Sequence, residues 1–153
     1  MIDLTALLQN GVVLPSLAAS SRKHVFHALC AELAVITQID EREIFDAVMQ
    51  RERLGSTGVG EGVAIPHARL EGLEQPLGAF ARLEAPVDFE ALDDRPCDLV
   101  FMLLAPINAG ADHLRALAAV SRAFREASVR DALREAVTQE EVTSILCKRK
   151  TAA

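Results

Sequence analysis

The stretch "LVFMLLA" (Leu99–Ala105) decides the fold of this chain, because every residue in it is apolar. Successive side chains of a strand point to opposite faces, so both faces of a strand over these residues would be apolar. Such a strand is typical of the centre of a sheet that is covered on both sides. We therefore expect an α/β fold in which helices flank a mixed central β-sheet on both faces. The 153 residues (1–153) suit a single domain.

Other strands are predicted on the N-terminal side of this one. "GVVLP" from Gly11 predicts a short strand that Pro15 ends, and "LGAFARL" from Leu77 predicts another. "VAI" before Pro66 predicts a short extended segment, because a residue that precedes proline is biased away from the helical region. Residues 54–62, "LGSTGVGEG", hold four glycines and show neither a helical nor a strand period. They predict a loop.

Helices are predicted where apolar residues recur on one side and a capping residue precedes them. Leu114 and Val137 are among the side chains that we expect on buried helix faces. The predicted helices are Leu4–Gln9 after Asp3, one from Ser20 or Ser21 to about Val35, one from Asp40 to about Glu52, one from Asp112 to about Arg125, and two that start at Ser128 and Thr138.

Charge and cysteine content exclude several classes of protein. The net charge is −6 and both signs are interspersed, which argues against a binder of nucleic acid. We expect the basic cluster Lys148-Arg149-Lys150 to be a solvated helix end. The three cysteines, Cys30, Cys97 and Cys147, form no C-x-x-C motif, so neither a zinc site nor a disulfide framework is predicted. Each is expected to be a buried small hydrophobe in a reducing compartment.

No targeting or membrane segment is predicted. The N-terminus "MIDLTALLQNG" lacks the basic region and the long apolar run of a signal peptide. The longest apolar stretch, Leu99–Pro106, is too short to span a bilayer. We expect a cytoplasmic protein that does not insert into a membrane.

His67 is the first candidate for chemistry, in "GEGVAIPHARLEG" (Gly60–Gly72). It follows Pro66 at the expected end of an extended segment, where a turn begins, and such positions beside a strand commonly carry function. The proline fixes the local backbone, and the preceding glycines let the main chain approach a ligand. An equally weighted alternative is a histidine that a backbone carbonyl satisfies at a strand end.

His113 and Arg51 are the next candidates. His113 lies at the start of a helix, where free N–H groups suit an anion and the helix dipole favours a neutral ring, although a plain capping turn is the alternative. Arg51 and Arg53 end a helix. Each is either a favourable helix-end charge or a guanidinium that binds phosphate oxygens. His24 and His27 lack further metal ligands nearby and are expected to be ordinary helix residues.

Two histidines, an arginine, a glycine-rich loop and a helix N-terminus together suggest phosphoryl chemistry. The glycine-rich loop lacks the G-K-[ST] ending of a nucleotide-binding P-loop, and no G-x-S-x-G or H-E-x-x-H motif is present. The phosphate would therefore come from another protein and not from bound ATP. We expect no cofactor and no metal ion.

Three segments resemble one protein family in order along the chain. "RERLGSTGVGEGVAIPHARL" (Arg51–Leu70) looks like the active-site segment of the fructose/mannitol-type enzyme IIA proteins of the bacterial phosphotransferase system. "VDFEALDDRPCDLVFMLLAP" and "DHLRALAAVSRAF" are similar to the next two segments of that family. The resemblance covers nearly the whole chain and is closest to the stand-alone nitrogen-regulatory branch.

The resemblance implies roles for three residues. His67 would be the phosphorylated histidine, and Arg51 and His113 would support the phosphoryl group, together with main-chain N–H groups of the glycine-rich loop. Arg53 matches no functional position. Family members often have glycine after the active histidine, where this chain has Ala68. That departure puts in doubt a strict need for positive φ at this position.

The resemblance also implies a phosphotransferase function. Neutral His67 would accept the phosphoryl group from the phosphohistidine of an HPr-like phosphocarrier protein. The phosphorylation state would then regulate nitrogen, potassium or carbon metabolism through target proteins. The alternative is a fructose- or mannitol-specific enzyme IIA that passes phosphate to a separate IIB component in sugar uptake. A third possibility is a binding module in which His67 is structural.

Overall fold

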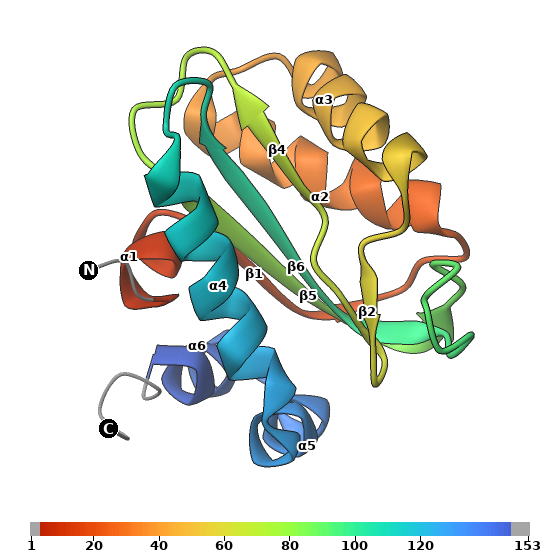
Figure 1. Cartoon of the computed structure of the whole chain (residues 1–153). Helices are drawn as coiled ribbons and strands as arrows, with labels where there is room; N and C mark the ends of the chain where they lie inside the picture. Colours follow the sequence, from red (N-terminus) through yellow and green to blue (C-terminus); the bar gives the residue numbers. More distant parts are fainter. Residues whose placement is uncertain (1–3, 148–153) are drawn as a thin grey trace.

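A six-stranded mixed sheet lies between two groups of helices in the computed structural model, which describes residues 4–147 (Figure 1). This confirms the expected fold class. In sheet order the strands are β1 (Val12–Leu17), β5 (Leu77–Val87), β6 (Cys97–Pro106), β3 (Val63–Ala64) and β2 (Gly58–Gly60), with β4 (His67–Leu70) paired to β6. β1 is parallel to β5, β5 is antiparallel to β6, β3 and β4 are both parallel to β6, and β2 is antiparallel to β3.

Helices cover both faces of this sheet, as Figure 1 shows. The helices are α1 (Leu4–Gln9), α2 (Arg22–Thr37), α3 (Glu41–Leu54), α4 (Ala111–Arg125), α5 (Ala127–Glu135) and α6 (Gln139–Cys147). One face carries α2 and α3, and the other carries α1, α4, α5 and α6.

Strand β6 is the centre of both cores. Val100, Met102 and Leu104 pack in the core on the α2–α3 side. The alternate residues Leu99, Phe101 and Leu103 pack in the core on the α4 side. All of these side chains are fully buried, which explains why the stretch has no polar residue on either face.

Three of the predicted helix starts are confirmed. Ser21 caps α2, where its hydroxyl accepts from the His24 N–H at 3.1 Å. Asp40 caps α3. Before α6, the Glu141 N–H donates to Oγ1 of Thr138 at 3.0 Å, and Oε1 of Glu141 accepts from the Thr138 N–H at 3.1 Å. This reciprocal pair is a capping box.

Two predicted caps are wrong, because the helices begin earlier. Gly110 precedes α4 with φ 56°, a left-handed conformation that glycine adopts readily, so Asp112 lies inside the first turn. Glu126 ends α4 and also precedes α5, so Ser128 lies inside the first turn of α5. Nη1 of Arg130 donates to two carbonyls at the end of α4, which joins the two helices without a loop.

Two strand predictions also need correction. β1 continues past Pro15 to Leu17, which an edge strand allows because the missing proline N–H leaves no gap in the sheet. The predicted loop 54–62 contains β2. Glu61 (φ 58°) and Gly62 (φ 79°) then form the two-residue turn into β3, and positive φ at both positions is typical of a tight hairpin.

Some burial predictions are wrong as well. Leu114 is 63% exposed and Val137 is 69% exposed. α4 turns His113 and Ala116 inward in place of Leu114. Cys30 and Cys97 are buried as expected, whereas Cys147 is half-buried. Within residues 4–147 no helix is long and apolar enough to cross a bilayer. The predictions for Asp3 and for the 148–150 cluster lie outside the described residues.

Candidate functional site

His67 begins a strand, whereas we predicted it at the end of one. β3 and β4 lie in line along the same side of β6, where Val63 is opposite Leu99 and His67 is opposite Leu103. Pro66 separates the two strands, because it has no N–H to donate to a ladder. Its carbonyl still accepts from the Leu103 N–H at 2.9 Å. His67 is therefore the first residue of a strand that resumes after a proline break.

The two ring nitrogens of His67 have different partners. Nδ1 lies 2.9 Å from the Ile65 carbonyl oxygen, which can only accept, so Nδ1 carries the proton. Nε2 accepts from Nε–H of Arg51 at 3.2 Å. The neutral ring thus presents its lone pair on Nε2, and that lone pair can act as a nucleophile.

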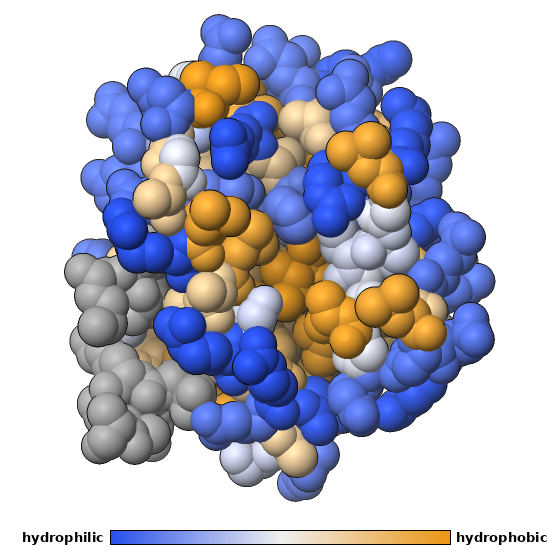
Figure 2. All heavy atoms as spheres, viewed as in Figure 1, coloured by the Kyte–Doolittle hydropathy of each residue, from blue (hydrophilic) through white to orange (hydrophobic). Residues whose placement is uncertain are grey.

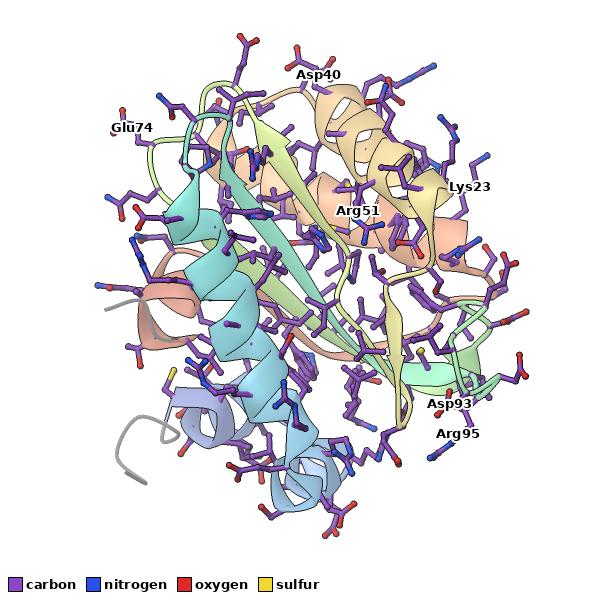
Figure 3. All side chains as sticks on the ribbon, viewed as in Figure 1. Lys23, Asp40, Arg51, Glu74, Asp93 and Arg95 are labelled. Atoms are coloured by element: carbon purple, nitrogen blue, oxygen red, sulfur yellow. The ribbon has the colours of Figure 1, made fainter. Side chains whose placement is uncertain are left out.

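Arg51 reaches His67 from the last turn of α3. Figure 3 shows its side chain between α3 and β4. Nη1 of Arg51 also donates to the Gly55 carbonyl at 3.0 Å, which holds the guanidinium against the end of its own helix. Residues sixteen positions apart in the sequence are therefore in direct contact.

His113 approaches the same ring from the other side of the cleft. It is the third residue of α4 and is 5% exposed. Its ring centroid is 5.6 Å from that of His67, at an interplanar angle of 50°. Nδ1 of His113 is buried and has no hydrogen-bond partner among residues 4–147. An unpaired buried polar atom is costly and is commonly found where function requires it.

Both histidines favour the neutral state. Burial lowers the pKa of His67 below its ordinary value, and the Arg51 cation acts in the same direction, against the Ile65 carbonyl and Glu52. Burial also lowers the pKa of His113, as do the charges of His67 and Arg69. Neutral rings at pH 7 leave the Nε2 lone pair of His67 available.

These side chains line a cleft of about 470 Å³ between α3, β4 and α4. Of the described residues that line it, none is acidic. Leu54 (84% exposed) and Leu114 (63% exposed) lie at its sides. Figure 2 shows apolar side chains on both sides of a hollow on this face. The cleft is thus cationic inside and apolar at its rim, which suits a protein that carries a phosphate.

The remaining candidates lie elsewhere. Arg53 is exposed and lines a different hollow together with His27, whose ring stacks on Phe45 at a centroid distance of 4.0 Å. Nδ1 of His24 accepts from the Ser20 N–H at 3.3 Å at the start of α2. In the described part of the chain, no group of three or more His, Cys, Asp or Glu side chains is placed to hold a metal ion.

Three main-chain donors of the glycine-rich loop have partners away from the cleft. The N–H groups of Thr57, Gly58 and Glu61 already donate to side chains of Glu52, Ser56 and Asp93. Gly60 ends β2 and Gly62 lies in the hairpin turn, and neither lines the cleft. Their role in this structure is to reverse the chain before β3.

Ala68, the departure from the family pattern, lies in extended β4 and not at positive φ. Its methyl group is buried against the α2–α3 core. The extended conformation accommodates alanine without strain.

Sequence reasoning missed two buried polar residues beside the site, Glu52 and Thr57. One signal was available: Glu52 follows Ile44 and Val48 at intervals of four along α3, and all three are buried. A carboxylate in line with an apolar stripe must be paired inside the protein.

Comparison of the chain with known proteins identifies its family. The family described as "Phosphoenolpyruvate-dependent sugar phosphotransferase system, EIIA 2" matches residues 6–149. A nitrogen regulatory protein of Bradyrhizobium diazoefficiens is 46% identical over 145 residues, which cover 95% of each chain. A fructose-specific EIIA component of Haloferax volcanii is 41% identical over 112 residues, which cover 72% of this chain and 73% of the relative.

The fold agrees with these matches. The crystal structure of nitrogen regulatory protein IIA-Ntr from Neisseria meningitidis superimposes with a TM-score of 0.86 at 38% identity, over 94% of this chain and 98% of that one. With a family match over nearly all of its length, the chain belongs to the EIIA 2 family of the phosphoenolpyruvate-dependent sugar phosphotransferase system.

Proposed function

We propose that this protein is a regulatory phosphocarrier in which Nε2 of His67 accepts a phosphoryl group from an HPr-like phosphocarrier protein. The observation that carries the proposal is the arrangement of the His67 ring. Nδ1 is held by the Ile65 carbonyl, while Nε2 is directed at Arg51 in an open cleft. This is the geometry that a histidine nucleophile needs.

The transfer is a displacement at phosphorus. The bond between phosphorus and the donor ring nitrogen breaks as the bond to Nε2 forms, and the electron pair returns to the donor ring. The Nδ1 proton stays on His67, and the Ile65 carbonyl stabilises the positive charge that develops on the ring. The reaction needs in-line approach and stabilisation of the three equatorial oxygens more than it needs covalent assistance.

Arg51 and His113 are the groups that would stabilise those oxygens. Nε–H of Arg51 donates to the Nε2 lone pair in the resting chain. It must release this atom when the new bond forms, and it can then donate to a phosphoryl oxygen. His113 lies beside the same ring with Nδ1 unpaired among the described residues.

The rim of the cleft supports docking of a protein donor. Leu54 and Leu114 expose apolar side chains at the cleft that holds His67, and a partner that covers them would remove this apolar surface from water. The absence of carboxylates among the lining residues in 4–147 leaves the cleft without repulsion toward a phosphorylated partner.

The regulatory role is supported by the relative named as a nitrogen regulatory protein, which matches 95% of the chain. In this role the phosphorylation state of His67 controls nitrogen, potassium or carbon metabolism through the target proteins that the chain binds. A second candidate, transfer to a fructose- or mannitol-specific IIB component, is favoured by the fructose-specific relative.

Phosphorylation of His67 is the first test. The chain is incubated with the phosphocarrier, its upstream kinase and labelled phosphoenolpyruvate, and acid-labile label is measured. We expect His67→Gln to take up no label while it stays folded, and His27→Gln, a change of an exposed histidine that lies outside the cleft, to label as the wild type does. Label on folded His67→Gln would refute the assignment.

A second test separates regulation from transport. Phosphorylated chain is offered to purified fructose- and mannitol-specific IIB proteins, and cell extracts are passed over wild type, His67→Ala and His67→Asp. Regulation predicts partners that distinguish His67→Ala from His67→Asp. Efficient transfer to a IIB protein, with identical partners for all three chains, would favour the transport role.

A further inference from the structure

Glu52 is a buried carboxylate that the mechanism above does not use. It is 5% exposed, in the last turn of α3 next to Arg51. Oε2 accepts from Nη1 of Arg22 and from the Thr57 N–H, both at 3.1 Å, and Oε1 accepts from Oγ1–H of Thr57 at 2.7 Å. A buried charge is costly unless it is paired and hydrogen-bonded, and here both oxygens have partners.

From Thr57 the hydrogen bonds continue to His67. The Thr57 carbonyl accepts from the Ile65 N–H at 2.9 Å. The Ile65 carbonyl accepts from Nδ1–H of His67 at 2.9 Å. Glu52, Thr57, Ile65 and His67 thus form one continuous series of contacts, which joins the end of α3 to the start of β4.

The main chain of Glu52 also takes part in the turn that holds Arg51. The Gly55 N–H donates to the main-chain carbonyl of Glu52 at 3.2 Å, and the Gly55 carbonyl accepts from Nη1 of Arg51 at 3.0 Å. On the far side, Arg22 donates to the Phe89 carbonyl and pairs with Glu90 at 2.8 Å. Glu52 is therefore the point where α2, α3 and the loop before β2 are tied together.

We propose that Glu52 is a positioning residue for transfer onto His67: it holds the Ile65 carbonyl against Nδ1 and thereby keeps the Nε2 lone pair directed into the cleft. This inference rests on the proposed function. Glu52 does not line the cleft, so it acts through Thr57 and Ile65 and not on the phosphoryl group.

The physical effect is control of the imidazole tautomer. A neutral histidine carries its proton on either nitrogen, and only the form protonated on Nδ1 has a lone pair on Nε2. The Ile65 carbonyl selects this form from the Nδ1 side, and Nε–H of Arg51, which donates to Nε2, favours the same form. If the loop at Thr57 shifts, the carbonyl moves away, and part of the population places the proton on Nε2, where it blocks attack.

Glu52→Gln tests the proposal, because glutamine keeps the shape and removes the charge. We expect the single-turnover rate at saturating phosphorylated donor to fall on the order of tenfold, comparable to losing an outer-shell partner of a metal-bound histidine. The KM for the donor should not change. Nitrogen NMR of the His67 ring in the free chain should show the Nδ1–H form in the wild type and a mixture of both tautomers in the variant.

Asp98→Asn is the matched control. Asp98 is a half-buried carboxylate that, like Glu52, is paired with an arginine, Arg134 at 2.9 Å, but it is not part of the series that reaches His67. This change should lower stability without changing the rate at saturating donor or the ring tautomer.

Thr57→Val and Thr57→Ser keep the test valid if Glu52→Gln does not fold. Valine removes the hydroxyl that donates to Oε1 of Glu52, and serine retains it. Thr57→Val should show the mixed tautomer and the slower rate, and Thr57→Ser should resemble the wild type.

A wild-type tautomer and rate in folded Glu52→Gln, or in Thr57→Val where that is the variant that folds, would overturn the positioning role. The NMR comparison needs no donor protein. A wild-type chain that accepts no phosphate would therefore refute the proposed function, while the effect of Glu52 on His67 would still be measured separately.

Discussion

Arg51 and Arg53 end the same helix, yet only one of them reaches the histidine. Nε of Arg51 contacts Nε2 of His67 at 3.2 Å, whereas Arg53 faces a different hollow. Two residues along a helix differ by about 200° in direction, so neighbouring cations face opposite sides. The two side chains carry the same charge, and they differ only in the direction in which the helix points them.

This difference predicts unequal effects of two conservative changes. Arg51→Lys keeps the charge but loses the planar fork, so transfer should slow by roughly 10²–10³-fold, as for the loss of one preorganised donor in an oxyanion site. Arg53→Lys should leave the rate unchanged. Single-turnover transfer from the phosphorylated donor measures both. Equal rates in the two variants would mean that Arg51 is only a helix-end charge.

The neutral ring of His67 predicts the pH dependence. Burial lowers the pKa of His67, so the nucleophilic form persists below pH 6.5, the ordinary midpoint of histidine. The rate should rise with pH through this lowered pKa and be level at pH 7. Arg51→Gln removes a cation and should move the NMR titration midpoint of His67 upward. A downward or absent shift would show that Arg51 does not act on the charge of the ring.

At the scale of elements, the break between β3 and β4 creates the site. Pro66 interrupts pairing along β6, and the chain resumes with His67 as the first residue of β4. The Ile65 carbonyl before the break then accepts from the His67 side chain. Ile65 faces the β2 side of the chain, where its N–H donates to the Thr57 carbonyl. Because the Thr57 N–H donates to Glu52 instead, the Ile65 carbonyl is left to accept from the ring.

Helix capping gives a prediction of stability. Thr138→Ala removes the hydroxyl that caps α6 and should lower the free energy of unfolding by about 1 kcal/mol. Ser128→Ala changes an exposed residue inside the first turn of α5 and should stay within ~0.5 kcal/mol of the wild type. Urea denaturation compares them. A larger loss in Ser128→Ala would contradict the observed start of α5.

At the scale of the whole molecule, three elements from distant parts of the sequence form one face around the cleft. The end of α3, strand β4 and the start of α4 surround the cleft. Leu54 and Leu114 line it and are exposed, and Figure 2 shows apolar side chains beside a hollow on this face. We expect this face to bind the phosphocarrier, because apolar anchors beside a reactive group bury surface only in the complex.

Leu114→Ser tests this face. We expect the KM for the phosphorylated donor to rise about tenfold, equivalent to ~1.4 kcal/mol of lost contact, with little change in stability because the side chain is exposed. Leu92→Ser is the control, since Leu92 is 90% exposed and does not line the cleft. The same KM in both variants would place the docking surface elsewhere.

The sequence by itself determined the central strand, the fold class and most helices. These depend on local signals: apolar residues on both faces of Leu99–Ala105, and capping residues such as Ser21 and Thr138. Its position after Pro66 also made His67 a candidate, with a structural histidine as an equally weighted alternative. Periodicity and capping act within a few residues of the chain, so they can be recognised without knowing the fold.

Only the tertiary structure decided how these parts meet. The contact of Arg51 with His67, the exposure of Leu114 and the burial of Glu52 depend on how α3, β4 and α4 pack around one cleft. The two predicted caps that were wrong are Asp112 and Ser128. α4 begins earlier because of the turn at Gly110, and α5 begins earlier because it follows the end of α4 directly. Such contacts join residues far apart in the sequence, and they stabilise an element only once the chain has folded and brought those residues together.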